Sequence, residues 1–415
     1  MSLTETLFTE SDLFAKRKVH LAVTGSIAAY KAADLLRAFK KAGLRVSMTV
    51  SNGALNFVSP KLFEALGASP VYTDTFGVQE DCFAHLWPGQ NAEVMVLAPA
   101  SANALGALAQ GLADRLLTAQ ALAFPGPLVV APAMNPKMYA HPALQANLKI
   151  ISERGALIVK PDLGSTACGE SGIGKLAQVE EIFWTTLKAL TPDDMVGLDV
   201  LITAGPTREY WDSVRFLSNP SSGRMGMCLA LAAWMRGAKV HLIVGPGVDF
   251  LMPKDIKVTQ VTTAHEMFQA SSDLWPAMDI GMFTAAVADF SPIPYKDGQV
   301  KFKKQDAGDS LEISLKRNED ILAHLANEKR PSQKILAFAA ETTPDMESLV
   351  SVAQEKCKRK KADLLAANRV NPGESTFGSP TNQVCVVNSA GCGEIWPVLS
   401  KSEVAWRLCS WLLKK

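Results

Sequence analysis

The sequence lacks the features that mark membrane proteins and secreted proteins. Its longest apolar runs, such as 227–235, are much shorter than the ~20 residues that a helix needs to cross a bilayer. Residues 1–18 mix acidic and basic side chains and contain no apolar core of a signal peptide. The seven cysteines are odd in number and scattered, which argues against a disulfide framework. We therefore expect a cytoplasmic protein with reduced thiols and no membrane partner.

The sequence also lacks an excess of charge of either sign. Its 42 basic side chains are balanced by 41 acidic ones, which argues against a protein that coats nucleic acid. The basic runs 301–304 and 356–361 are short, so RNA binding is a distant alternative. Apolar residues make up 48% of the 415 residues, and a chain of this length and composition predicts two or three globular domains.

Two successive α/β patterns divide the chain. In the first, apolar runs at 18–24, 46–50, 93–98 and 127–131 predict strands, with a helix between the first two. Proline and paired aspartates at 191–194 suggest a linker. The second pattern has predicted strands at 198–203, 240–244, 278–283 and 335–338, and it ends with a hairpin at 383–399 and a helix capped by Ser400. We predict two open, mostly parallel, doubly wound α/β sheets, in domains 1–190 and 191–415.

Small-residue loops follow these predicted strands, at the edge where such sheets bind ligands. Gly25 and Ser26 lie between a strand and a helix, where free N–H groups can hold a phosphate. A tight turn without a ligand is equally consistent with this pair. The full GxGxxG fingerprint is absent, so a standard NAD site is not supported.

Two residues of the first half could carry reactive chemistry. Cys168 lies among the four glycines of 164–174, a composition typical of a mobile flap, where a thiol can act as an acid or a nucleophile. An inert loop cysteine is the alternative. Cys82 and His85 have a Cys-x-x-His spacing, but no second pair completes a zinc site. His85 could instead orient or deprotonate a substrate, or simply lie on the surface.

Two segments of the second half suit an anionic ligand. Residues 215–226 combine Arg, Asn, Ser and Gly just before a helix. Lys356 and Lys360 share one helical face at a spacing of four residues, where like charges repel unless a polyphosphate lies between them. A solvated charged face is the ordinary alternative.

Together, eight short motifs resemble one family from about residue 17 to the end of the chain. They are TGSIAAYK at 24–31, APASAN at 98–103, PAMNPKM at 132–138, ACG at 167–169, TAGPTRE at 203–209, SNPSSG at 218–223, AAVAD at 285–289 and FAAET at 338–342. Their order resembles the bifunctional coenzyme A biosynthesis enzymes, in which a phosphopantothenoylcysteine decarboxylase is fused to a phosphopantothenate–cysteine ligase. The resemblance implies a flavodoxin-like or Rossmann-like flavin domain and a Rossmann-like ligase domain.

For the first half, the resemblance implies FMN-dependent decarboxylation of 4′-phosphopantothenoylcysteine to 4′-phosphopantetheine. It implies that FMN and its phosphate lie against Gly25, Ser26, Ser51 and Ser101. It also implies that Asn135 and Met138 contact the substrate, that Cys168 is the catalytic acid, and that His85 is the family's histidine at this position.

For the second half, the resemblance implies ligation of cysteine to 4′-phosphopantothenate through an acyl-cytidylate made from CTP. Asn219, with Arg215, would hold the phosphopantothenate end. Mg²⁺ with unknown protein ligands would bridge the phosphates, which Lys301, Lys356 and Lys360 would neutralise. The nucleotide would lie against Phe283, Thr284, Ala285, Ala286, Asp289, Glu319, Asp320, Ile321, Leu322 and Phe338. The resemblance further implies a homo-oligomer, a dodecamer of trimers and dimers.

The sequence departs from the family pattern at a few positions. Tyr139 replaces a usual Trp, 175–176 is Lys-Leu instead of Arg-Met, Pro220 follows Asn219, and 87–91 resembles an insertion after His85. Two other functions compete with this assignment. A regulatory FMN-binding module conflicts with the presence of His85, Asn135 and Cys168. A flavin prenyltransferase-like enzyme or dinucleotide oxidoreductase conflicts with the ligase half and the missing GxGxxG.

Overall fold

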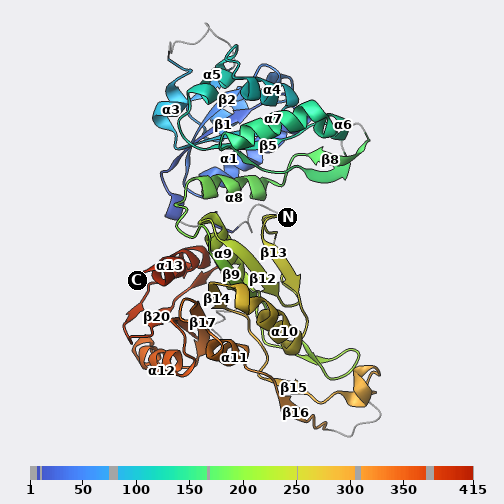
Figure 1. Ribbon diagram of the computed structural model, residues 1–415, viewed down its shortest axis with the longest axis vertical. Coiled ribbons are helices and arrows are strands. Elements are labelled where there is room, and N and C mark those ends of the chain that lie inside the picture. The colour runs from blue at the N-terminus through green and yellow to red at the C-terminus, as the bar shows by residue number, and fades with distance from the viewer. Residues whose placement is uncertain are drawn as a thin grey trace. The chain divides into compact units, whose positions relative to one another are not determined.

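The computed structural model describes residues 7–9, 12–73, 83–165, 169–249, 251–303, 310–370 and 378–414. The chain forms two compact units, Met1–Pro192 and Asp193–Lys415, and each is described by itself (Figure 1). No helix in the described parts of the chain combines the length and the apolar character needed to cross a bilayer.

The first unit is built on a six-stranded parallel sheet in the order β3-β2-β1-β4-β5-β6. Its four inner strands β2, β1, β4 and β5 are almost entirely buried, because helices cover both faces of a parallel sheet, and such strands are apolar runs in the sequence. The four strands predicted for this half are confirmed to within about two residues at each end. The strands are β1 (Lys18–Val23), β2 (Arg45–Val50), β3 (Val71–Thr73), β4 (Val94–Ala100), β5 (Leu128–Pro132) and β6 (Leu157–Ile158).

Helices pack on this sheet, and an antiparallel hairpin follows its last strand in the chain. One apolar cluster joins the sheet to α4, α5 and α7. Helices α1 and α8 contact each other, and α8 contacts β4 and β5. The hairpin is antiparallel and consists of β7 (Asp162–Ser165) and β8 (Ser171–Lys175). The helices are α1 (Ala32–Lys41), α2 (Pro60–Ala65), α3 (Trp87–Asn91), α4 (Ala102–Gln110), α5 (Leu116–Ala123), α6 (Pro136–Ala140), α7 (Pro142–Glu153) and α8 (Val179–Ala189).

The second unit has an eight-stranded sheet in the order β13-β12-β9-β14-β17-β18-β20-β21. The first six strands are parallel, and β20 and β21 add an antiparallel hairpin, so both the parallel sheet and the predicted hairpin are confirmed. The strands are β9 (Asp199–Ala204), β12 (Lys239–Val244), β13 (Lys257–Gln260), β14 (Ile280–Phe283), β17 (Lys334–Glu341), β18 (Leu364–Arg369), β20 (Cys385–Asn388) and β21 (Gly393–Ile395).

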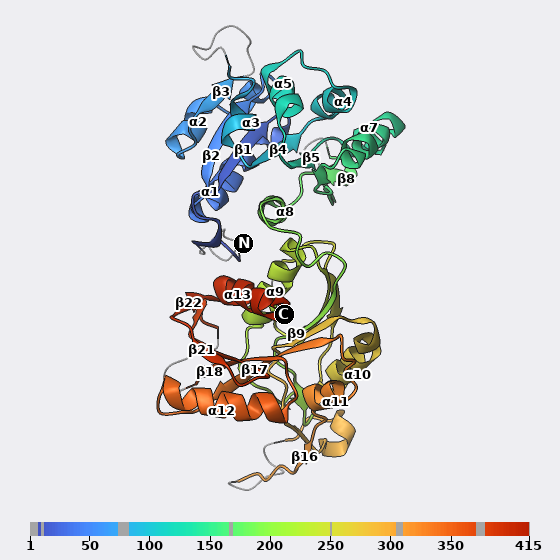
Figure 2. The ribbon, with the colours of Figure 1, turned by 60° about the vertical axis from the view of Figure 1, so that its left-hand side comes forward.

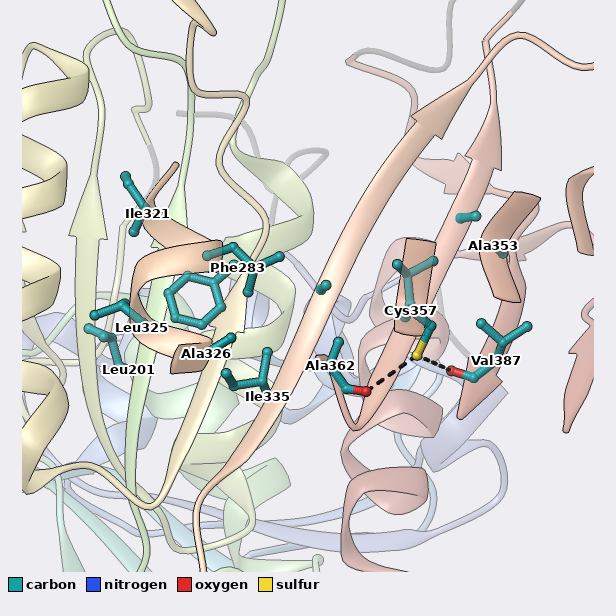
Figure 3. Packing of buried hydrophobic residues seen from close by; sticks show 14 of the residues in the cluster. Leu201, Phe283, Ile321, Leu325, Ala326, Ile335, Ala353, Cys357, Ala362 and Val387 are labelled. Atoms are coloured by element: carbon teal, nitrogen blue, oxygen red, sulfur yellow. Dashed lines mark hydrogen bonds between the residues drawn. The ribbon is translucent and has the colours of Figure 1, made fainter. Parts of the chain in front are cut away.

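Two groups of helices cover this second sheet (Figure 2). Helices α10 (Ala264–Leu274), α11 (Ile321–Asn327) and α12 (Met346–Arg359) share one apolar cluster with the sheet. In this cluster the Cys357 thiol lies 3.3 Å from the carbonyl oxygen of Ala362 and 4.0 Å from that of Val387 (Figure 3). Helix α9 (Arg224–Met235) packs against β9, β12 and β14, and also against α13 (Lys401–Leu413). Ser400 and Glu403 form a capping box at the start of α13, which confirms the predicted cap.

Two short antiparallel pairs form an arm that extends from the second sheet (Figure 1). They are β10 (Glu209–Tyr210) with β11 (Phe216–Leu217), and β15 (Phe290–Pro292) with β16 (Leu315–Arg317). The arm exposes many apolar side chains, which a monomeric surface rarely concentrates in one place. They are Tyr210, Val214, Phe216, Leu217, Phe290, Ile293, Val300, Leu311, Ile313 and Leu315. The sequence analysis did not predict this arm.

Candidate functional site

The first unit has a cavity of about 630 Å³ at the carboxyl ends of β1, β2 and β4. The chain runs outward from β1 to β2 and β3, then returns to β4 on the other side of β1, so β1 and β4 flank the point where the strand order reverses. Open parallel sheets bind ligands at this point. Among the predicted flavin-site residues, Gly25, Ser51, Ser101 and Met138 line the cavity.

Close backbone packing shapes one wall of this cavity. A Cβ atom on Gly25 would lie 2.9 Å from the carbonyl carbon of Gly53, so only glycine lets these two loops approach each other. The Ser51 hydroxyl accepts a 3.3 Å hydrogen bond from the Ala54 amide, and the Ser101 hydroxyl caps α4. Ser26 caps the 3₁₀ turn that follows and does not line the cavity. Glycine backbone and serine hydroxyls suit a phosphate, so the residues present fit the predicted flavin phosphate.

Asn135 forms the N-cap of α6, and its side chain also contacts Glu170, the residue just before β8. Its Nδ2 donates a 2.6 Å hydrogen bond to Glu170, whose other oxygen lies 2.5 Å from the Lys137 ammonium. These hydrogen bonds, first that of Lys137 and then that of Asn135, lower the pKa of Glu170. Glycines let β8 pack on this loop, because a Cβ on Gly174 would lie 2.5 Å from the carbonyl oxygen of Met134. Cys168 lies outside the described residues.

A buried polar chain supports the loop that carries His85. The two ring nitrogens of His20 are hydrogen-bonded to the hydroxyls of Ser47 and Thr49. The Thr49 hydroxyl donates a further hydrogen bond to the side-chain oxygen of Gln120. The Gln120 amide in turn donates a 2.9 Å hydrogen bond to the carbonyl of Ala84, the residue before His85. Burial lowers the pKa of His20 to about 3, so this imidazole is neutral at physiological pH.

The structure places His85 in a turn before α3, half-buried, and not in the wall of the flavin-site cavity. The residues 87–91, which the sequence analysis treated as an insertion, form α3, whose Trp87 ring lies 6.1 Å from that of Tyr72 and 6.5 Å from that of His20. The insertion is therefore a packed part of the unit.

The second unit has a pocket of about 570 Å³, also at the point where its strand order reverses, between β9 and β14. All ten residues predicted to lie against the nucleotide line this pocket. Asn219, Lys356 and Lys360 line it as well. The structure thus brings thirteen of the predicted residues, from motifs far apart in the sequence, into one pocket. Phe283 and Phe338 supply its aromatic surface.

Backbone hydrogen bonds hold the loops of this pocket together. Asn219 Nδ2 lies 3.4 Å from the carbonyl oxygen of Ala286 and 3.1 Å from that of Val287. The Ala286 amide donates to the Gly205 carbonyl at 2.9 Å. The N–H of Ala286 is thus engaged within the protein. Gly226, at the end of the predicted anion-binding segment, lets α9 approach this loop, because a Cβ there would lie 2.7 Å from the Thr284 hydroxyl.

Two of the three lysines predicted to neutralise the triphosphate, Lys356 and Lys360, are paired with carboxylates. Lys356 forms an ion pair with Glu341, and the Lys360 ammonium lies 3.4 Å from Asp320. These pairs relieve the repulsion between the two lysines that their spacing on α12 suggests. The cations face the pocket with their charge balanced, and an entering polyphosphate would replace these carboxylates as the partner.

Arg215 and Lys301 do not line the pocket. The Arg215 guanidinium lies 2.6 Å from Asp212 and 3.2 Å from the carbonyl oxygen of Phe302. Burial would raise the pKa of Asp212, but backbone amides and Arg215 together lower it to about 2. Lys301 is exposed beside Phe302, whose ring packs 5.1 Å from that of Trp211. Both residues therefore belong to the arm, and their predicted roles stay predictions.

The sequence analysis missed several polar residues that line the second pocket. They are Asn368, Asn382 and Lys401, whereas Arg224, which also lines the pocket, belongs to the segment 215–226 that was predicted to suit an anionic ligand. It also missed His20, Gln120, Lys137 and Glu170 of the first unit. His20, Ser47 and Thr49 did leave a signal, because they are polar residues inside two apolar strands. In the described part of the chain, no group of three His, Cys, Asp or Glu side chains could hold a metal ion.

The chain has two α/β domains with one cleft each, and family models identify both domains as those of flavoproteins. Residues 8–191 match the family model described as Flavoprotein, and 195–415 match the DNA/pantothenate metabolism flavoprotein C-terminal domain. The chain is 41% identical to the coenzyme A biosynthesis bifunctional protein CoaBC of Bacillus subtilis, covering 94% of this chain and 95% of that protein. It is 37% identical to that of Escherichia coli, over 89% and 90%.

Among solved structures, the C-terminal domain of a CoaBC protein has a TM-score of 0.43 and 33% identity, covering 53% of this chain and 96% of that one. A PPC decarboxylase complexed with pantothenoylaminoethenethiol has a TM-score of 0.37 and 32% identity, covering 41% and 96%. The chain belongs to the CoaBC family of bifunctional coenzyme A biosynthesis proteins. The resemblance seen in the eight motifs is thereby confirmed.

Proposed function

We propose that this bifunctional enzyme joins cysteine to 4′-phosphopantothenate with CTP and then decarboxylates the product with FMN to give 4′-phosphopantetheine. The observation that carries the proposal is that each compact unit has its own cleft at a strand-order reversal, lined by residues of the matching family half. The test is to incubate the purified protein with 4′-phosphopantothenate, cysteine, CTP and Mg²⁺ and to identify the product by mass. Absence of both the ligated and the decarboxylated product would overturn the proposal.

In the first unit, Gly25, Ser51 and Ser101 would hold FMN at the mouth of the sheet, and its absorption spectrum in the purified protein would report it. FMN, when bound, supplies reversible two-electron chemistry at the thiol-bearing carbon, which lets the adjacent carboxylate leave as CO₂. The Asn135 amide would donate to that carboxylate. Cys168 would return a proton to the carbon after CO₂ leaves.

Glu170 occupies the Asn135 contact that we propose for the substrate carboxylate. Its carboxylate accepts the hydrogen bond from Asn135 Nδ2, which is the group that the proposal assigns to the substrate carboxylate. The substrate therefore has to share or replace this contact. The Lys137 ammonium lies 2.5 Å from Glu170 and would therefore also lie near a substrate carboxylate that replaces Glu170 at Asn135.

In the second unit, the proposed ligation has two steps that balance. A carboxylate oxygen of 4′-phosphopantothenate bonds to the α-phosphorus of CTP, and pyrophosphate leaves. The amine of cysteine then bonds to the acyl carbon, the acyl C–O bond breaks, and CMP leaves as the nitrogen loses a proton. Lys356 and Lys360 would face the phosphates, Asn219 the acyl group, and Phe338 the base. Charge-assisted contacts of this kind stabilise the developing charge on the leaving pyrophosphate.

Mg²⁺ would enter this pocket with the triphosphate and not as a resident ion. The described residues offer no three-ligand cluster, and Mg²⁺ in phosphoryl-transfer sites is held largely by phosphate oxygens and water. Asp289 and Glu319 line the pocket and are the carboxylates that would face such an ion. A preference for CTP over ATP would have to come from contacts other than the engaged Ala286 amide.

The exposed apolar arm supports a homo-oligomer, because pairing of two arms would bury these side chains. We propose a dodecamer of trimers and dimers in the cytoplasm. The five described cysteines are free. Light scattering tests the assembly, and a monomeric mass with both activities present would overturn it.

A further inference from the structure

The ligase pocket contains a polar corner to which the proposed function assigns no role. Arg224, Asn382 and Lys401 line it. Two short strands bring Asn382 and Lys401 together, because β19 (Thr381–Asn382) pairs with β22 (Leu399–Ser400). Lys401 begins α13 directly after β22, and its amide donates a 2.9 Å hydrogen bond to the carbonyl of Pro380.

Helices α9 and α13 run in the same direction and begin at this corner. Near their starts, the Cys228 thiol of α9 lies 3.8 Å from the Ser402 hydroxyl of α13. Near their ends, Arg236 donates hydrogen bonds to the Trp406 carbonyl and to the Ser410 hydroxyl at 3.2 and 2.9 Å. Their positive ends therefore lie side by side, and each begins with a cation, Arg224 and Lys401. Such a corner favours an anionic group.

Lys401 is deeply buried in this corner, with only 6% of its surface exposed. Burial lowers the pKa of its ammonium; Cys228 partly opposes this shift, and the nearby charge of Arg224 adds to it. An anion placed between the two cations would oppose both effects. An anion in this corner would therefore interact favourably with two cations at once.

Asn382 adds a second and independent requirement. Its side chain lines the pocket and is only 7% exposed, and no group among the described residues donates a hydrogen bond to its Oδ1. A buried carbonyl oxygen without a donor costs free energy that a ligand N–H would recover. The ligand that suits this corner carries an anionic group and an N–H donor close together.

An α-amino acid meets both requirements, because its carboxylate and its amine are attached to the same carbon. The triphosphate of CTP and the amino group of its base lie at opposite ends of the nucleotide. Residues 219–224 line the pocket without a break, and they connect this corner to Asn219, which the proposed function places at the acyl group.

We propose that Arg224, Asn382 and Lys401 form the subsite for the cysteine substrate of the ligation step. The carboxylate of cysteine lies between Lys401 and Arg224, and its amine donates a hydrogen bond to Asn382 Oδ1. The two cations disfavour the ammonium form of cysteine and favour the neutral amine, which is the nucleophile. This subsite rests on the proposed ligase function.

The test compares cysteine with cysteamine, which has the same thiol and amine but no carboxylate. In the full-length protein, the ratio of kcat/KM for cysteine to kcat/KM for cysteamine is measured by CMP release. We expect Lys401→Gln to lower this ratio by roughly tenfold or more, the effect of losing one charge-assisted contact, while Lys401→Arg retains most of it. The ratio does not depend on how much of the variant is folded. Lys358→Gln, an exposed lysine on α12 outside the pocket, should leave the ratio unchanged.

The second variant tests the amine contact. Asn382→Ala should lower kcat/KM for cysteine and for cysteamine by a similar factor, because both carry the amine, and should leave the ratio near that of the wild type. Pyrophosphate release before amine is added reports activation alone, and neither variant should change the KM for CTP or 4′-phosphopantothenate in that step. An unchanged ratio in Lys401→Gln, with or without a higher KM for CTP or 4′-phosphopantothenate, would overturn the subsite. Absence of CTP-dependent pyrophosphate release in the wild type would instead overturn the proposed function.

Discussion

The two clefts occupy the same place in two similar sheets, yet they are built from different chemical groups. In the first unit, glycine backbone and serine hydroxyls line the reversal of strand order, and Gly25 and Gly53 approach too closely for any side chain. In the second unit, lysines paired with carboxylates line the equivalent position. A ligand that stays bound suits fixed backbone groups, whereas a nucleotide that enters and leaves each cycle suits mobile charges that exchange partners.

The largest test of this comparison separates the two chemistries. Cys168→Ser should lower 4′-phosphopantetheine formation by about 10²- to 10⁴-fold, the usual contribution of a positioned proton donor. Ligation, measured as pyrophosphate release, should stay at the wild-type rate, because the ligase pocket lies within the other unit. Cys392→Ser, which changes an exposed free cysteine, is the matched control. A parallel loss of ligation in a folded Cys168→Ser protein would show that the two activities share a site.

Ligand affinity in the pocket of the second unit should depend strongly on its lysines. In the cavity of the first unit, where backbone groups line the site, no single side chain should matter as much. Lys356→Gln should raise the KM for CTP about 10- to 100-fold, because it removes a cation and leaves the Glu341 carboxylate to repel the triphosphate. Lys356→Arg should retain much of the affinity, and Lys358→Gln should match the wild type. Nucleotide titrations of the full-length protein measure the effect. An unchanged KM in Lys356→Gln would place the triphosphate elsewhere in the pocket.

The first sheet should respond to acid through His20. Burial lowers the pKa of His20 to about 3, so between pH 6.5 and 3 the unfolded chain binds a proton that the folded unit does not. The free energy of unfolding of the first unit is therefore not reduced by His20 above pH 6.5, and it falls as the pH decreases below 6.5. The loss should be about 2 kcal/mol at pH 5. Hydrogen exchange of β1 and β2 amides, corrected for intrinsic rates, measures it. His20→Asn should be less stable at pH 7 but lack this dependence, and an equally steep fall in that variant would assign the effect to other groups.

The smallest effect concerns Glu170. Glu170→Gln removes the anion that accepts from Asn135 and Lys137, so the substrate carboxylate no longer competes with it. We expect the KM for 4′-phosphopantothenoylcysteine to fall by about 2- to 10-fold, the effect of one hydrogen bond. Glu153→Gln, an exposed residue of α7, is the control. A higher KM would mean that Glu170 supports Asn135 and does not compete for it.

Much of the fold could be predicted from the sequence because buried parallel strands are continuous apolar runs that end in small-residue loops. The resemblance of the eight motifs to one family, and not the loops alone, implied most of the residues that line the second pocket, including Asn219 and Phe338. The arm could not be predicted, since β10, β11, β15 and β16 are two or three residues long and leave apolar side chains exposed. Lys401 resembled an ordinary first residue of a helix. Only the pairing of β19 with β22 and the packing of α13 on α9 bring it to Arg224 and Asn382.

The position of Lys401 also orders events during synthesis. The first unit ends at Pro192, so all strands of its sheet leave the ribosome while the second unit is still being translated. The ligase pocket, in contrast, takes Asn382 and Lys401 from the last part of the chain, and α13 ends at Leu413. The second pocket therefore cannot close until Asn382 and Lys401, which are translated long after Pro192, have left the ribosome. The unit translated first can take up its ligand earlier, although it performs the later of the two proposed reactions.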